Sequence, residues 1–214
     1  MKALGQAIEL LTRGALPKTW ANVQFYIGQA YELKGDFTDA AAADEYFLEI
    51  NPTDLGVLKH LSHLDHEQLF QFDRALELDE RRLKIDISTA ARLDVEEASL
   101  TAADFTGCIQ QAEAIREADS SARDLLVRDT FKLACQWGAG QKAATREGAT
   151  ELVPKAEGLK APDWEVTGTR QFLASSPVFG PGRASWVALF DSLENGDGTA
   201  MANSSHQIVE VMRN

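Results

Sequence analysis

Apolar residues recur at helical spacing along most of the chain, and the clearest stretch runs from Trp20 to Pro52. The Gly35-Asp36 pair predicts a turn inside it, and Pro52 ends the second helix because proline lacks the N–H that the helix needs. The two predicted helices show the spacing of one buried face each. These faces carry Ile27, Gly28 and Tyr31 on the first helix and Phe37, Ala40, Ala43, Phe47 and Ile50 on the second.

This window resembles a tetratricopeptide (TPR) repeat, a helix pair of about 34 residues. The resemblance rests on the small residue Gly28, on Tyr31, on the turn glycine Gly35, on Ala40 and on the closing Pro52. Small residues are expected at two of these positions because the helices of a TPR pair cross closely there. An unrelated helical hairpin is the alternative interpretation of the same pattern.

The period continues on both sides of the window. Pro17 precedes Pro52 by 35 residues, and Pro154 lies three units of 34 residues beyond Pro52. We therefore predict TPR-like repeats over residues 1–154, with a half unit at 1–17 and units at about 18–52, 53–87, 88–120 and 121–154.

The later repeats are less regular than the first. The small residue of the second repeat, Ala75, is one place out of register, which indicates a single-residue insertion. In the third repeat, Phe105 and Cys108 occupy the places of the first phenylalanine and first alanine of the earlier second helix. The fourth repeat has Gly138-Ala139-Gly140 as its predicted turn.

The repeat register is lost beyond residue 154. The segment at 155–214 is expected to be a connector followed by helices and to cap the stack, since a terminal repeat must cover its exposed core face. The predicted fold is an all-α, right-handed TPR-like α-solenoid of stacked antiparallel helix pairs with a C-terminal capping helical hairpin. The expected helices of this segment are Asp163–Ala174, Ala184–Glu194 and Thr199–Arg213, with a loop at Ser175–Arg183.

The opening residues 6–52 resemble the repeat arrays found at the C-terminal end of larger bacterial TPR proteins, and residues 66–84 resemble them less strongly. In such proteins a signalling or effector domain precedes the repeats. The resemblance therefore implies that this chain is the C-terminal piece of a longer protein or an excised fragment.

The chain is acidic, with a formal net charge of −12. Such a surface repels nucleic acids and anionic lipids, so we expect neither as a partner. Between Glu32 and Glu97 there are 17 acidic against 7 basic residues. This middle region either faces a basic partner or is a solvated helix exterior.

The two cysteines, Cys108 and Cys135, lie inside apolar helical patterns and are not spaced as metal ligands. We interpret them as reduced core residues, as is usual in the cytoplasm. The N-terminus lacks the apolar region of a signal peptide, and no apolar run is long enough to span a membrane. The predicted location is cytoplasmic.

The TPR resemblance also implies a binding site. In that family the first helix of each pair lines a concave groove that holds a peptide or a partner helix. Transferring its second, fifth, ninth and twelfth helix positions to this chain gives a mixed polar set. The alternative is that these are ordinary solvated side chains. The set is Asn22, Phe25, Gln29, Glu32, Lys59, His63, His66, Leu93 and Glu97.

Three histidines, His60, His63 and His66, are the one cluster that suggests a metal. Their spacing spreads them over about 120° of a helix, which is too wide for one ion. A pair of them would still need further ligands, so we predict no metal and no cofactor, and a pH response is the alternative role.

No nucleophile motif or Cys–His pairing is present, so the chain is not expected to be an enzyme. We expect a scaffold or adaptor for a protein or peptide partner. The alternatives are homo-oligomerisation through the apolar face at residues 1–16 and a sensor tail of a larger bacterial signalling or effector system.

Overall fold

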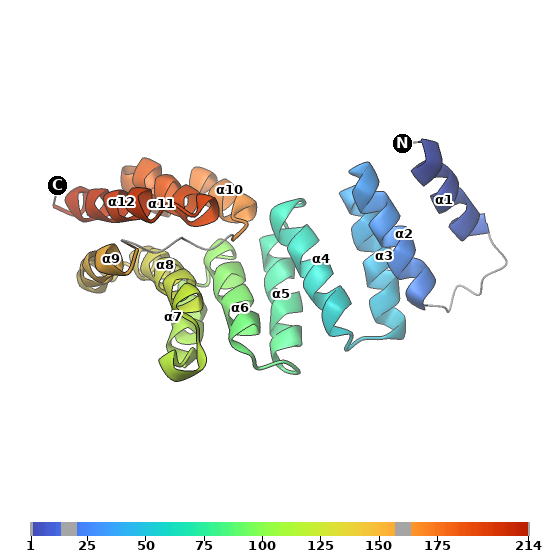
Figure 1. Cartoon of the computed structure of the whole chain (residues 1–214), viewed down its shortest axis with the longest axis horizontal. Helices are drawn as coiled ribbons and strands as arrows, with labels where there is room; N and C mark the ends of the chain where they lie inside the picture. The colour runs from blue at the N-terminus through green and yellow to red at the C-terminus, as the bar shows by residue number, and fades with distance from the viewer. Residues whose placement is uncertain (1, 14–20, 157–163, 214) are drawn as a thin grey trace. The chain divides into compact units, whose positions relative to one another are not determined.

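The protein is all-α. A computed structural model describes residues 2–13, 21–156 and 164–213, and within these ranges the chain forms twelve α-helices and two short 3₁₀ helices. Helices that are neighbours in the chain pack against each other, as in a helical repeat (Figure 1). The chain divides into two compact units, unit 1 (Met1–Asp86) and unit 2 (Ile87–Asn214).

Unit 1 contains two helical hairpins and one preceding helix. α2 pairs with α3 and α4 pairs with α5, while α3 packs against α4 and α1 packs against α2. The helices are α1 (Lys2–Arg13), α2 (Ala21–Lys34), α3 (Phe37–Ile50), α4 (Leu55–Glu67) and α5 (Phe72–Leu83).

The close crossing predicted for the first hairpin is present. A Cβ atom on Gly28 of α2 would lie 3.4 Å from the carbonyl oxygen of Ala40 and 3.6 Å from the Cβ atom of Ala43, both on α3. The connecting turn contains Gly35 with a φ of +82°, a conformation that glycine adopts without strain. The predicted reason for small residues at these positions is therefore confirmed.

The core of unit 1 is built mainly from aliphatic side chains of its hairpins. Leu58 and Leu64 of α4 are fully buried, and α4 begins at an N-cap in which Asp54 accepts a hydrogen bond from the backbone N–H of Val57. One buried cluster contains Ala41, Phe47, Leu48, Val57, Leu58, Leu61 and Leu78.

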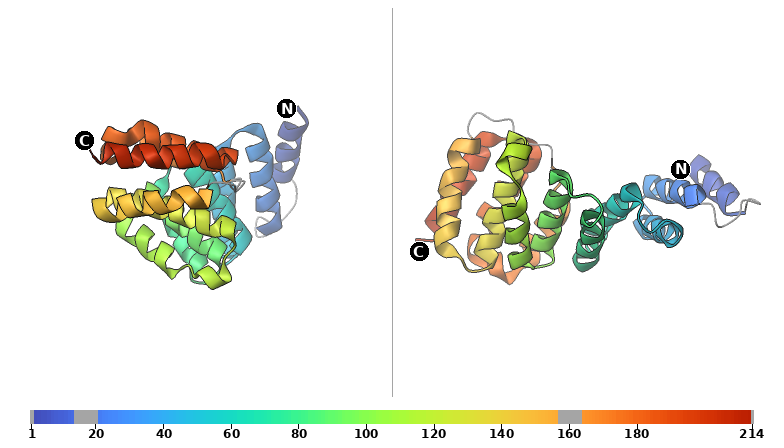
Figure 2. Two further views of the ribbon diagram at one scale, coloured as in Figure 1. Left: turned by 60° about the vertical axis from the view of Figure 1, so that its left-hand side comes forward. Right: turned by 90° about the horizontal axis from the view of Figure 1, so that it is seen from below.

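Unit 2 combines two further hairpins with a C-terminal extension. α6 pairs with α7 and α8 pairs with α9, and α10, α11 and α12 then pack against α6, α8 and α9 respectively (Figures 1 and 2). The elements are α6 (Thr89–Thr101), α7 (Phe105–Ala114), η1 (Glu117–Asp119), α8 (Ala122–Gly138), α9 (Lys142–Ala156), α10 (Thr167–Ser175), η2 (Pro177–Gly182), α11 (Arg183–Asn195) and α12 (Gly198–Val211).

Aromatic side chains hold the extension in place. The ring centroids of Phe131 on α8 and Phe190 on α11 are 5.0 Å apart, and those of Trp137 on α8 and Trp186 on α11 are 5.8 Å apart. Phe179 in η2 packs edge-on against Trp186 and is fully buried. The extension thus packs against three helices of unit 2. Its role as the cap of a repeat stack stays a prediction.

The two cysteines of unit 2 form a disulfide. Cys108 on α7 and Cys135 on α8 are both fully buried, with their Cα atoms 6.2 Å apart. Their burial was expected, but the prediction that they are reduced is wrong. Two core cysteines on neighbouring helices face each other here, and spacing along the chain gives no sign of this.

Predicted turns and helix starts in unit 2 are partly confirmed. α7 begins at Phe105, and α8 ends at Gly138 with Gly140 at a φ of +73° in the following turn. α10 begins at Thr167 instead of Asp163, which lies outside the described residues, as does Pro17.

Pro154 does not end its helix as predicted. α9 continues through it to Ala156, where the last turn brings Leu152 and Ala156 into the core. A proline near a helix C-terminus removes one hydrogen bond, and burial of the neighbouring apolar side chains offsets that loss.

Within the described ranges, none of the helices has both the length and the apolar character required to cross a membrane.

Candidate partner-binding surface of unit 1

Two rows of polar side chains are exposed on α2 and α4. Asn22 and Gln29 lie on α2, and Lys59 and His63 lie on α4. Residues spaced by four or seven share a helix face, so each row points in one direction. The exposure expected for these four residues is confirmed.

A polar contact joins α2 and α4. The carboxylate Oε2 of Glu32 on α2 lies 3.0 Å from the imidazole Nε2 of His60 on α4. Glu32 is a predicted groove residue, whereas the sequence suggests a metal-ligand or pH-response role for His60 and no place in the groove. Glu32 and His60 lie near these rows along their helices, because each is three residues from an exposed row member, Gln29 and His63 respectively.

The other ring nitrogen of His60 reaches a buried acid. Its Nδ1 lies 2.5 Å from Oδ2 of Asp44 on α3, whose side chain is fully buried. The hydrogen bond to Asp44 outweighs the effect of burial, and with help from Glu32 it raises the pKa of His60 to about 9. His60 is therefore protonated at neutral pH and donates to both carboxylates.

Gly28 leaves room for this acid. A Cβ atom on Gly28 would lie 3.0 Å from Oδ1 of Asp44. The sequence predicts a small residue at position 28 because two helices cross there. The same small residue also leaves space for the Asp44 carboxylate between α2 and α3.

Two predicted groove residues of unit 1 lie elsewhere. Phe25 is half-buried against the core, with its ring centroid 6.4 Å from that of Phe47. His66 is buried, with Nδ1 2.6 Å from Oε1 of Glu67 and its ring 5.5 Å from that of Phe72. An exposed position is therefore wrong for His66 and only partly right for Phe25.

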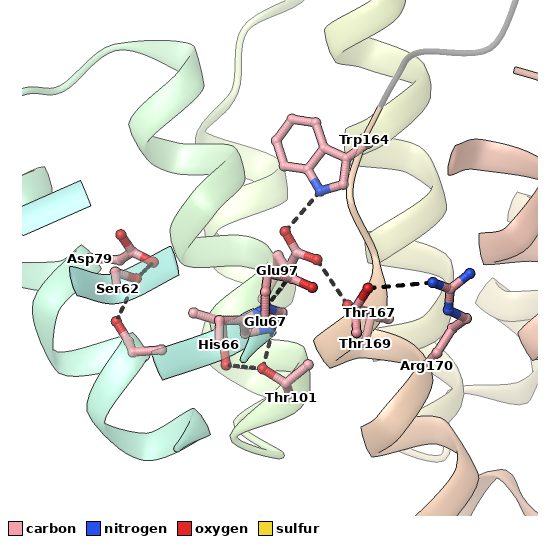
Figure 3. A network of polar contacts seen from close by, with 12 residues as sticks. Ser62, His66, Glu67, Asp79, Glu97, Thr101, Trp164, Thr167, Thr169 and Arg170 are labelled. Carbon is pink, nitrogen blue, oxygen red and sulfur yellow. Dashed lines mark hydrogen bonds and ion pairs between the residues drawn. The ribbon is translucent and has the colours of Figure 1, made fainter. Parts of the chain in front are cut away.

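Glu97, the groove residue predicted in unit 2, is also buried. Its Oε2 accepts a hydrogen bond of 2.8 Å from Nε1 of Trp164, and its Oε1 accepts one of 2.9 Å from Oγ1 of Thr169 (Figure 3). Leu93 on the same helix is buried as well. The prediction of exposure is wrong for both, because α6 packs against α7, α8 and α10, and Thr169 of α10 contacts Glu97 directly.

Unit 1 has a second ion cluster, which the sequence does not predict. Nε of Arg74 on α5 lies 3.1 Å from Oδ2 of Asp65 on α4, and its Nη2 donates to Glu45 on α3. Asp65 is fully buried, and burial raises its pKa to about 6 although Arg74 opposes the shift. These three residues are far apart in the chain, and no motif links them.

Unit 1 also has a surface hollow of about 360 Å³ on the side of α3 and α5. Its apolar part consists of Leu48, Leu61 and Leu78, each less than a tenth exposed. Charged side chains surround this floor. They are Glu45, Glu49, Arg74, Glu77 and Arg81.

The three histidines do not converge on one point. His60 contacts Glu32 and Asp44, His66 contacts Glu67, and His63 is exposed. This agrees with the wide fan expected from their spacing.

Neither a protein-family model nor any curated protein matches this chain.

Proposed function

We propose that the chain is a TPR-like scaffold or adaptor whose unit 1 holds a peptide or a partner helix against α2 and α4. The observation that carries the proposal is the exposure of Asn22 and Gln29 on α2 and of Lys59 and His63 on α4. The contact between Glu32 and His60 joins these two helices. The rows offer both donors and acceptors, which suits the backbone and side chains of a bound segment.

The charge and the disulfide refine this proposal. The net charge of −12 favours a protein with basic groups over nucleic acid or an anionic membrane. The Cys108–Cys135 disulfide favours an oxidising compartment over the cytoplasm expected from the sequence.

The test is affinity capture of partners from a lysate of the source cells, followed by calorimetry with the purified partner. The test variant carries Gln29→Ala, Lys59→Glu and His63→Ala. The matched control carries the same three changes at exposed sites of unit 2, namely Gln171→Ala, Lys142→Glu and His206→Ala.

A partner that binds the wild type and the control, but not the test variant, supports the proposal. A partner that binds all three proteins places the site away from α2 and α4. Circular dichroism of each variant checks that the helices are intact.

A second function, self-assembly, is favoured by exposed apolar side chains in unit 1. Leu10 on α1 is 73% exposed, and Tyr26 and Leu33 on α2 are 58% and 72% exposed. Ile8, by contrast, is buried, and α1 packs against α2, so the first helix has a partner within the chain. Sedimentation over a range of concentrations tests this function, and a strict monomer at the highest concentration rejects it.

A further inference from the structure

The hollow on α3 and α5 combines an apolar floor with an unbalanced charged rim. Leu48 of α3, Leu61 of α4 and Leu78 of α5 each contribute to the lining. A large apolar side chain from outside would therefore meet leucines from three helices. Burial of apolar surface of this kind is the usual anchor of a protein contact.

One of the two basic groups of the rim is paired with acidic side chains. Arg74 holds Glu45 and Asp65, and Nη2 of Arg81 donates a 3.2 Å hydrogen bond to the carbonyl oxygen of Pro52. Among the described residues, the exposed acids Glu49 and Glu77 have no ion pair. Arg81 keeps its positive charge, because its hydrogen-bond acceptor is a neutral carbonyl. The rim has three acidic side chains against two basic ones, so its net charge is negative.

The surface of α3 around the hollow is also negatively charged. α3 carries four acidic residues and no basic one. Of these, Asp39, Glu45 and Glu49 are exposed. An acidic or phosphorylated segment would be repelled here, whereas lysine or arginine beside an apolar residue would be attracted.

We propose that this hollow docks an amphipathic segment of a partner protein in which an apolar anchor is flanked by lysine or arginine. The inference rests on the proposed role of unit 1 in protein binding, but it assigns a different surface, formed by α3 and α5 in place of α2 and α4. The anchor contacts the three leucines, and the basic side chains pair with Glu49 and Glu77.

The first test uses a short fluorescein-labelled helical peptide of leucine and lysine, with a matched peptide of leucine and glutamate as control. Spectra of the full chain with labelled leucine methyl groups locate the bound peptide. The expected shifts are at Leu48, Leu61 and Leu78 and only with the lysine peptide. Shifts confined to other leucines, or no binding, would overturn the proposal.

The second test reverses the two unpaired acids. Glu49→Lys with Glu77→Lys is expected to weaken binding of the lysine peptide about tenfold. The control, Glu147→Lys with Glu151→Lys on the exposed part of α9, makes the same charge change in unit 2 and is expected to leave most of the affinity. Equal losses in both variants would show only general charge attraction and would reject the site.

The α2–α4 variant separates this inference from the proposed function. Gln29→Ala, Lys59→Glu and His63→Ala together should leave the lysine peptide bound to the hollow. Loss of the peptide in that variant alone would support the α2–α4 surface and overturn the assignment to α3 and α5.

Discussion

The imidazole Nδ1 of His60 lies 2.5 Å from the carboxylate Oδ2 of Asp44, and through this contact a buried acid of α3 meets a cation of α4. A charge taken out of water is costly unless it is paired, so Asp44 depends on this partner. Because the second ring nitrogen contacts Glu32, the same imidazole links three helices of unit 1.

The stability of unit 1 should fall as the pH rises through the alkaline range. The folded-state pKa of His60, about 9, lies above the value of 6.5 expected when unfolded. The contribution of protonated His60 to the free energy of unfolding is therefore complete below about pH 6.5 and is lost towards pH 9. Its upper bound is about 3 kcal/mol. Urea unfolding of the wild type and His60→Gln, at about pH 6 and about pH 9.5, measures it as the difference between the two proteins.

The exposed histidine His206 provides the control for this experiment. His206→Gln should leave the pH dependence of the wild type unchanged. An identical pH dependence in the wild type and His60→Gln would contradict the role of the imidazole.

Gly28→Val should destabilise unit 1 by about 1–3 kcal/mol through overpacking. The new side chain would press on Asp44 and on the backbone of Ala40. The matched control is Gly5→Val in α1, where a Cβ atom meets nothing within 4 Å. Thermal unfolding compares the two variants, and equal midpoints would show that the crossing of α2 and α3 tolerates the larger residue.

Glu96→Gln should stabilise unit 2 at neutral and alkaline pH. Glu96 on α6 is fully buried and neither carboxylate oxygen has a hydrogen-bond partner among the described residues. Burial raises its pKa well above the usual value, although Arg128 opposes the shift. The folded state thus keeps a proton that the unfolded chain releases above about pH 4.5, so wild-type stability falls as pH rises.

Denaturant unfolding at about pH 4.5 and about pH 8 tests this expectation for Glu96. The variant should gain stability over the wild type only at the higher pH. Glu147→Gln, at an exposed position of α9, should have no such effect. A gain of the same size at both pH values would point to packing instead of ionisation.

The disulfide predicts that the unfolded, unreduced chain has no thiol to alkylate. Mass spectrometry should show two added groups only after reduction. Reduction should lower the free energy of unfolding by about 2–4 kcal/mol, since Cys108 and Cys135 close a loop of the chain. Two reactive thiols before reduction would restore the interpretation of reduced cysteines.

The first hairpin was predictable because its signals are local. Gly28, Gly35 and Ala40 meet requirements set by a neighbouring helix or turn within the same repeat. The start of α7 at Phe105 and the turn at Gly140 follow for the same reason. In contrast, α9 continues past Pro154 because its last turn buries Leu152 and Ala156 in the core of unit 2, and this burial is not visible in the local sequence.

The candidate surface was predictable only as far as exposure follows helix periodicity. Gln29, Lys59 and His63 are exposed because their rows face away from the hairpin partner. The burial of Glu97 by Trp164 and Thr169 was not predictable, since these contacts span 67 and 72 residues of chain.

The sequence by itself determined the helices, most of their turns and the small residues at the first crossing, because periodicity and backbone preferences act within a few residues. Tertiary structure alone decided the bonding of His60 to Glu32 and Asp44, the Cys108–Cys135 disulfide and the cover over α6. These features depend on which faces meet after the hairpins pack, and packing selects them through burial and charge pairing between distant residues.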